Sequence, residues 1–219
     1  MKAILNAIGD FDTLPLDKRR CIDVGAYHGS WSKALSDRGA GPVYAIEADC
    51  DNNKVLLAGL KGNIIPCRCA ISSEKGNNKF YYAKHPDGRA GSSQSNSLDR
   101  KQLERKPWAD IQWDWVKCHT MDSFCKKHGI DKERPLHFVK LNCEGGEYEI
   151  FINSPTHSWL SFTQSMYVAF HNLDAMGPQI QLVRELVEEH GFIEHALTLK
   201  DRGHYLWIQN GDKPQEGGK

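Results

Sequence analysis

The chain has 219 residues, and its 28 Lys and Arg balance its 28 Asp and Glu, so the formal net charge is zero. This length suits one sizeable domain, and the charge balance leaves no basic excess to hold a nucleic-acid backbone. No apolar run reaches the roughly 18 residues of a membrane span, and the segment from Met1 to Leu16 is no signal peptide. We therefore expect a cytoplasmic enzyme or enzyme domain, and the oligomeric state stays open.

The cysteine spacing argues against a structural metal site. Seven cysteines are present, an odd number, and none forms a Cys-x-x-Cys pair with a second pair downstream. Zinc-ligand spacing is therefore absent, and we expect no metal. Cys21, Cys67 and Cys69 lie in strand-like runs and are interpreted as small core residues.

Strand and helix patterns alternate along the chain. In the first half we predict a strand at 21–24, a helix at 30–38 with Ser30 as its N-cap, a strand at 42–46, a helix at 51–60, a strand at 63–70, and extra strands at 79–83 and 115–119. In the second half we predict a helix from Thr120 to Gly129, a strand at 136–141, a helix from 146 to before Pro155, a strand at 165–170, a helix at 179–190, and a closing hairpin of 192–199 with 205–209.

This alternation predicts an α/β fold. Right-handed crossovers return each strand to the same sheet, so we expect a mostly parallel, Rossmann-like sheet with helices on both faces and an antiparallel last strand. We predict one domain over residues 1–210, with an insert or lid at about 80–116 and a disordered tail at 211–219. Ligands of such sheets bind at the carboxyl ends of the strands, so the candidate site residues are sought there.

The first strand end is a glycine-containing turn, Asp23 to Gly29, which leads into a helix. Glycine allows a sharp turn and a close approach of the backbone to a ligand, and the helix N-terminus offers free N–H groups. Asp23 would repel the pyrophosphate of a dinucleotide but would attract the ammonium group of a methionine moiety. The alternative is that Asp23 only caps the turn.

Two further strand ends complete a candidate cofactor site. Glu47 ends the second strand about 20 residues after Gly25, where a carboxylate can accept both ribose hydroxyls as hydrogen bonds. Ala70 ends the third strand, where small apolar groups would admit an adenine ring, although ordinary strand packing explains Ala70 equally well.

Polar groups after two later strands are the candidate catalytic residues. Asn142 and Glu144 follow an apolar strand directly, while Glu147 enters the next helical turn and is interpreted as a helix cap. His171 follows the apolar run Tyr167 to Phe170 and is predicted to accept a proton from an acceptor hydroxyl, because its ordinary pKa lies near working pH. A purely structural histidine is the alternative.

These motifs together resemble the FkbM family of class I S-adenosylmethionine-dependent methyltransferases, over about Cys21 to Phe170. The resemblance is carried by Ile22-Asp-Val-Gly-Ala-Tyr-His-Gly29, Val43-Tyr-Ala-Ile-Glu47, Thr120-Met-Asp-Ser-Phe124 and Lys140-Leu-Asn-Cys-Glu-Gly-Gly-Glu147. It implies a seven-stranded sheet with an antiparallel final strand. It also implies S-adenosylmethionine as cofactor, bound by Asp23, Gly25, Ala26, Tyr27, Gly29, Ser30, Glu47, Ala48, Ala70 and Asn142, with Asn142 and Glu144 lining the methyl-transfer site.

Two positions depart from the family pattern. Tyr27 stands where an Asn is usual, and Asn142 stands where an Asp is usual, which removes a negative charge from the reacting centre. If the reaction needs a base there, His171 and Glu144 are the candidates. A neutral amide is also a poorer ligand for a divalent metal than a carboxylate.

The resemblance implies methyl transfer to a small-molecule or glycan acceptor, most simply to a hydroxyl of a sugar, glycan or secondary metabolite. The charge balance leads us to expect no nucleic-acid partner. A nicotinamide-dependent oxidoreductase is one alternative, opposed by Asp23 and by the closing hairpin. A non-catalytic S-adenosylmethionine-binding module is another, supported by Asn142. The insert carries Trp108, Trp113 and Trp115, which either close over the acceptor or pack the insert onto the sheet.

Overall fold

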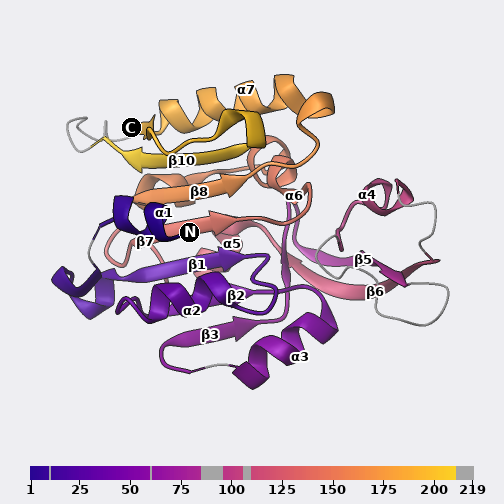
Figure 1. Ribbon diagram of the computed structural model, residues 1–219, viewed down its shortest axis with the longest axis horizontal. Helices are drawn as coiled ribbons and strands as arrows, with labels where there is room; N and C mark the ends of the chain where they lie inside the picture. The colour runs from indigo at the N-terminus through magenta and orange to yellow at the C-terminus, as the bar shows by residue number, and fades with distance from the viewer. Residues whose placement is uncertain (10, 60, 85–95, 106–109, 211–219) are drawn as a thin grey trace.

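The computed structural model of the protein describes residues 1–9, 11–59, 61–84, 96–105 and 110–210. Its centre is a seven-stranded sheet of order β3-β2-β1-β7-β8-β10-β9 (Figure 1). The strands are β1 (Arg20–Val24), β2 (Val43–Ile46), β3 (Ile64–Cys67), β7 (Leu136–Leu141), β8 (Ser165–Ala169), β9 (Phe192–Glu194) and β10 (His204–Gln209). The first five in sheet order are parallel, and β10 runs antiparallel to both of its neighbours. The predicted Rossmann-like fold with an antiparallel last strand is confirmed.

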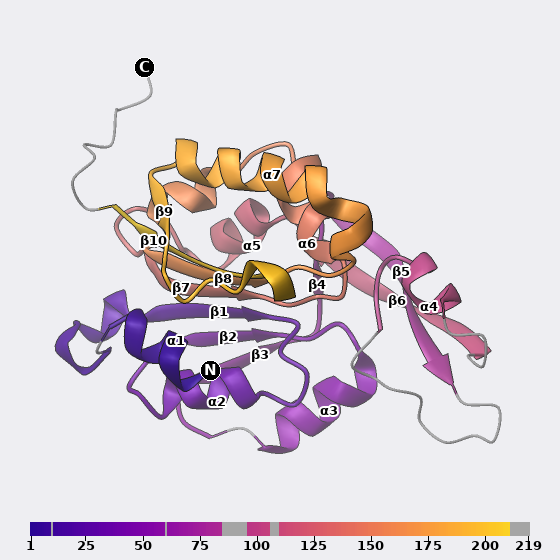
Figure 2. The ribbon, with the colours of Figure 1, turned by 45° about the horizontal axis from the view of Figure 1, so that its top comes forward.

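Helices cover both faces of this sheet (Figure 2). They are α1 (Lys2–Ala7), α2 (Ser30–Ser36), α3 (Cys50–Gly59), α5 (Met121–Lys127), α6 (Gly146–Tyr148) and α7 (Leu173–Glu189), with the π-helix η4 (Glu149–Asn153) continuing α6. Short 3-10 turns are η1 (Phe11–Thr13), η2 (Leu16–Lys18), η5 (Ser158–Phe162) and η6 (Lys200–Arg202).

The two faces arise from the alternation of side chains along each strand. On β1 and β2, Ile22 and Tyr44 face the core shared with α5, η4 and α7. Their neighbours Cys21 and Val43 face the opposite core, beneath α1 and α2. Because both faces are covered, these strands are uniformly apolar, which explains why their runs were recognisable in the sequence.

Three predicted boundaries were wrong for identifiable reasons. Gly29, not Ser30, is the N-cap of α2, because its φ of 84° is easily adopted only by glycine. The predicted strand 63–70 divides, since the backbone turns after Cys67 and Ala70–Ile71 (β4) pairs in another sheet. Helix α7 begins at Leu173, before Pro178 and not after it, because proline already has a helical φ and costs one hydrogen bond near the start.

The insert forms a three-stranded sheet, β4-β6-β5, which projects from one end of the central sheet (Figure 1). Strands β5 (Gly76–Lys84) and β6 (Asp110–His119) are antiparallel and longer than predicted, and α4 (Lys101–Glu104) lies beside β5. Trp113 and Trp115 are 45% and 56% exposed and contact each other edge to face. Neither side chain lines the cavity described below, while Trp108 and the predicted tail lie outside the described residues.

Candidate active site

A cavity of about 360 Å³ opens where β1, β2 and β7 end. Nine of the predicted site residues line it: Gly25, Ala26, Tyr27, Ser30, Glu47, Ala48, Ala70, Asn142 and Glu144. Apolar side chains, including Ile46, Ile71 and Phe80, form much of the remaining wall. Asp23, Gly29 and His171 are not among the lining residues. The structure thus brings these nine residues together at the carboxyl edge of the sheet.

Gly25 is at the tightest backbone position of the cavity. Its φ is 69°, and a Cβ there would lie 1.9 Å from the carbonyl oxygen of Asn142. The N–H groups of Gly25 and Ala26 both donate to the carbonyl of Ile46, which ties the turn to β2. No other residue type fits this position without moving the β1 and β7 loops apart.

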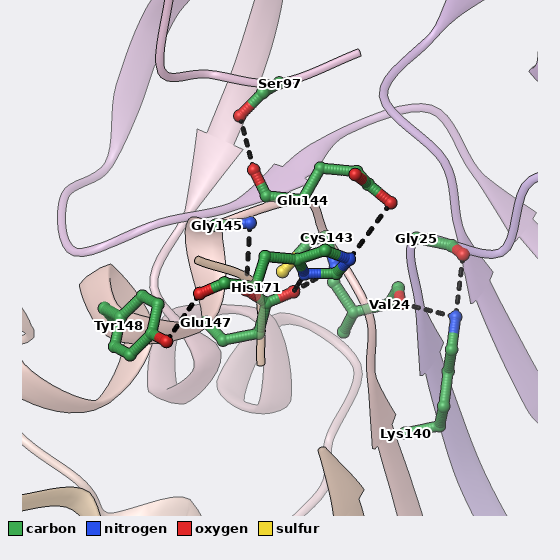
Figure 3. Close-up of polar contacts among 10 residues, drawn as sticks. All are labelled: Val24, Gly25, Ser97, Lys140, Cys143, Glu144, Gly145, Glu147, Tyr148 and His171. Atoms are coloured by element: carbon green, nitrogen blue, oxygen red, sulfur yellow. Dashed lines mark hydrogen bonds and ion pairs between the residues drawn. The ribbon is translucent and has the colours of Figure 1, made fainter. Parts of the chain in front are cut away.

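Asp23 is fully buried, and its carboxylate binds groups of the protein itself. Its carboxylate accepts hydrogen bonds from the backbone N–H (3.0 Å) and hydroxyl (2.7 Å) of Ser32, and it lies 2.9 Å from the ammonium of Lys140. The Lys140 ammonium also donates to the carbonyls of Val24 and Gly25 (Figure 3). Asp23 therefore stabilises the Gly25 turn through Ser32 and Lys140. Its carboxylate is not placed for direct contact with the ammonium group of a ligand.

Glu47 is 6% exposed and faces the cavity with both oxygens partly engaged. They accept hydrogen bonds from the N–H groups of Tyr27 (2.7 Å) and Asp49 (2.9 Å). Burial raises the pKa of Glu47, and those two backbone hydrogen bonds counter part of the rise. Each carboxylate oxygen has a second lone pair, so Glu47 retains the capacity to accept two hydroxyl hydrogen bonds.

Tyr27 shows how the departure from the usual Asn is accommodated. Its φ is 54°, a left-handed conformation that asparagine adopts more readily than tyrosine. The ring stacks on His28, with centroids 3.7 Å apart, and Tyr27 lines the cavity. Ring stacking and the bond to Glu47 hold this strained residue in place.

His171 lies between two carboxylates (Figure 3). Its Nε2 is 3.3 Å from Glu144, and its Nδ1 is 3.2 Å from Glu147. Burial alone would lower the pKa of His171, but the hydrogen bonds and charges of Glu144 and Glu147 outweigh it and raise the pKa to about 10. With an acceptor facing each ring nitrogen, the imidazole is doubly protonated at neutral pH.

Glu147 has two functions at once. It is fully buried and accepts the backbone N–H groups of Cys143 (2.6 Å) and Gly145 (2.9 Å), so it caps the turn after β7, as predicted. Its contact with His171 was not predicted. Tyr148 donates to the backbone carbonyl of His171 at 2.6 Å, which fixes the loop after β8 to the same unit.

Left-handed, non-glycine residues gather at this edge of the sheet. Among the described residues they are Tyr27, Glu144 and Asn172, one after each of β1, β7 and β8. Such conformations cost about 1–3 kcal/mol each and persist where surrounding contacts fix them. Two of them, Tyr27 and Glu144, line the cavity, which agrees with a functional site there.

The sequence missed Lys140, Asn96 and Ser97 as site residues. Lys140 gave one signal, a charged residue within the apolar strand 136–141, which is costly unless a partner is present. Asn96 lines the cavity and Ser97 contacts Glu144, but both belong to the low-complexity run 91–97, which has no periodicity and gave no signal.

The described residues contain no group of three or more His, Cys, Asp and Glu side chains arranged to hold a metal ion. Within the same part of the chain, no helix is long and apolar enough to cross a membrane.

Comparison with known proteins supports one family. The methyltransferase FkbM domain matches residues 23–194. No curated protein sequence matches the chain. Solved structures with a similar arrangement include a candidate RNA methyltransferase from Pyrococcus horikoshii, at 12% identity and a TM-score of 0.48, covering 97% of this chain and 82% of that one. A precorrin-6y C5,15-methyltransferase from Geobacter metallireducens is 12% identical with a TM-score of 0.45, covering 94% of this chain and 86% of that one. The fibrillarin pre-rRNA processing protein of Methanococcus jannaschii is 15% identical with a TM-score of 0.43, covering 91% of this chain and 71% of that one.

The sheet with its antiparallel β10, together with the family match over residues 23–194, defines a class I S-adenosylmethionine-dependent methyltransferase. Within that class, the chain belongs to the FkbM methyltransferase family.

Proposed function

We propose that the cavity binds S-adenosylmethionine and that the enzyme methylates a hydroxyl of a sugar, glycan or secondary metabolite. The observation that carries this proposal is a single cavity with a carboxylate at the end of β2, Glu47, and a second carboxylate after β7, Glu144. A volume of about 360 Å³ lies within the roughly 300–1,000 Å³ of small-molecule sites. The balanced charge of the chain favours a small-molecule or glycan acceptor over a nucleic acid.

The lining suits the parts of this cofactor. Glu47 has free lone pairs for the two ribose hydroxyls, and Ala48, Ala70 and Phe80 offer apolar contacts to a purine ring. The Gly25 turn and Asn142 would hold the methionine moiety, with Asp23 and Lys140 fixing that turn from behind. When bound, the cofactor supplies an activated methyl group on its sulfonium.

Glu144 is the proposed acceptor of the hydroxyl proton. His171 was predicted for this part, but a doubly protonated imidazole has no lone pair to receive a proton. The Glu144 carboxylate lines the cavity and holds an oxygen 3.3 Å from Nε2 of His171. In the proposal, the hydroxyl proton passes to a carboxylate oxygen of Glu144, while His171 orients that carboxylate and balances the charge of Glu147.

The experiment is a turnover assay that follows S-adenosylhomocysteine release with a panel of hydroxylated sugars, glycans and secondary metabolites. We expect Glu144→Gln to lower kcat by about 100-fold or more without preventing S-adenosylhomocysteine binding. Glu149→Gln is the matched control, because Glu149 is exposed and contacts Ser73 and Asn153 outside the cavity.

Two outcomes would contradict the proposal. Full activity of Glu144→Gln would mean that another group accepts the proton of the acceptor hydroxyl. Tight cofactor binding with no turnover on any acceptor would favour a non-catalytic binding module, the alternative that Asn142 supports.

A further inference from the structure

Three residues of the insert lie between the loop after β2 and the loop after β7, and two of them line the cavity. We call residues 96–98 the strap. At one end, Asn96 donates from Nδ2 to a carboxylate oxygen of Asp49 at 2.8 Å. At the other end, Ser97 donates from its hydroxyl to the backbone carbonyl of Glu144 at 2.9 Å (Figure 3). The strap therefore joins the loop after β2 to the loop after β7.

The strap is buried and firmly held. Ser97 is 2% exposed, and its backbone exchanges two hydrogen bonds with Tyr81 of β5, at 2.8 and 3.0 Å. Asn96 and Leu98 line the cavity. Hydrogen bonds to buried groups are costly to leave unmade, so these residues are ordered by specific contacts and not by chance proximity.

One anchor, Glu144, lines the cavity, and the other, Asp49, donates its backbone N–H to Glu47. Asp49 follows Glu47 by two residues, and its other oxygen accepts the N–H groups of Asp51 and Asn52 at the start of α3. Glu144 has a left-handed φ of 54°, a conformation that its surroundings must maintain. Its carbonyl is held by the Ser97 hydroxyl and its side chain by His171.

We propose that Ser97 is a positioning residue for Glu144 and that the strap couples binding in the cavity to the placement of that carboxylate. A ligand in the cavity contacts Asn96 and Leu98, so it favours the conformation in which the strap lies across the cavity. That conformation also carries the Ser97 hydroxyl to the Glu144 backbone. Cofactor binding would thus strengthen a contact that the strap already makes with the Glu144 backbone.

The coupling to cofactor rests on the proposed function, whereas the contact between Ser97 and Glu144 does not. The experiment separates the two. Hydrogen exchange of the full chain, followed by mass spectrometry over residues 143–147, reports the order of the β7 loop with and without S-adenosylhomocysteine. Calorimetry on the same samples gives the affinity for S-adenosylhomocysteine.

The variants are Ser97→Ala, Ser97→Thr and Ser73→Ala. Ser97→Ala removes the hydroxyl, and we expect exchange over 143–147 to become about fivefold to tenfold faster in the unliganded chain. In wild type, S-adenosylhomocysteine should slow exchange over 143–147, and Ser97→Ala should reduce that slowing to the part that comes from direct contact of the ligand with Cys143, Glu144 and Gly146. Ser97→Thr restores a hydroxyl and should recover most of the protection. Ser73→Ala is the matched control, since Ser73 bonds Glu149 outside the cavity.

The outcomes distinguish the two proposals. If unliganded Ser97→Ala exchanges over residues 143–147 at the wild-type rate, Ser97 is not a positioning residue for Glu144, whether or not any ligand binds. If wild type binds no S-adenosylhomocysteine, the proposed function fails and the exchange comparison still decides on Ser97. If Ser97→Ala does not fold, Asn96→Ala tests the opposite anchor, and unchanged exchange in that variant also contradicts the strap.

Discussion

At the residue scale, Gly25 carries the sharpest steric constraint of the site. A Cβ at this position would meet the Asn142 carbonyl, and φ is unfavourable for any other residue. We expect Gly25→Ala to lower the free energy of unfolding by about 2 kcal/mol or more. Urea unfolding measures this, with Gly59→Ala as control, because a Cβ at Gly59 of α3 meets nothing within 4 Å. Equal stability of the two variants would mean that the Gly25 turn is not rigid.

His171 gives the site a pH dependence. Its pKa is raised from 6.5 to about 10, so its contribution to stability is fully present below about pH 6.5 and is lost as pH rises towards 10. We expect His171→Gln to destabilise the protein at about pH 6.5 and to cost much less near pH 10. Urea unfolding across this range tests it, with His190→Gln of the α7 C-terminus as control. A cost that does not fall with pH would contradict the doubly protonated imidazole.

At the scale of elements, the pairing of β1 with β7 places a charged pair inside the sheet. Lys140 and Asp23 are 3% and 0% exposed and 2.9 Å apart. Removing one partner leaves a buried charge, so we expect Lys140→Met to cost about 3–5 kcal/mol in the free energy of unfolding. Lys33→Met removes an exposed pair with Asp37 and should cost under about 1 kcal/mol. Similar costs in urea unfolding would show that the buried pair does not hold the turn.

The same pair shows what could and could not be predicted. The buried strands were recognisable because both faces of the sheet are covered and their sequences are continuously apolar. The function of Lys140 was not recognisable, since its partner lies on another strand and local patterns do not reveal which strands pair. The early start of α7 was not predicted either, because the sequence interpretation began the helix after Pro178, although proline is tolerated near the start of a helix.

At the scale of the whole molecule, the candidate site is assembled from the ends of β1, β2, β7 and β8 and from the strap. General rules of parallel sheets predicted the first group, because ligands of such folds bind at the carboxyl ends of strands. The strap was not predictable, because the contact between Ser97 and Glu144 joins segments far apart in sequence. The partnership of His171 with Glu147 was missed for the same reason.

The proposed function depends on S-adenosylmethionine binding in the cavity with its ribose held by Glu47. The most direct measurement is calorimetric titration of wild type, Glu47→Gln and Asp51→Asn with S-adenosylhomocysteine. Hydrogen bonds to a charged group contribute about 1.5–3 kcal/mol, so Glu47→Gln should weaken binding roughly tenfold to a hundredfold. Asp51→Asn should bind as wild type does, since Asp51 pairs with Lys54 on the surface of α3. Binding by Glu47→Gln with wild-type affinity would contradict the account.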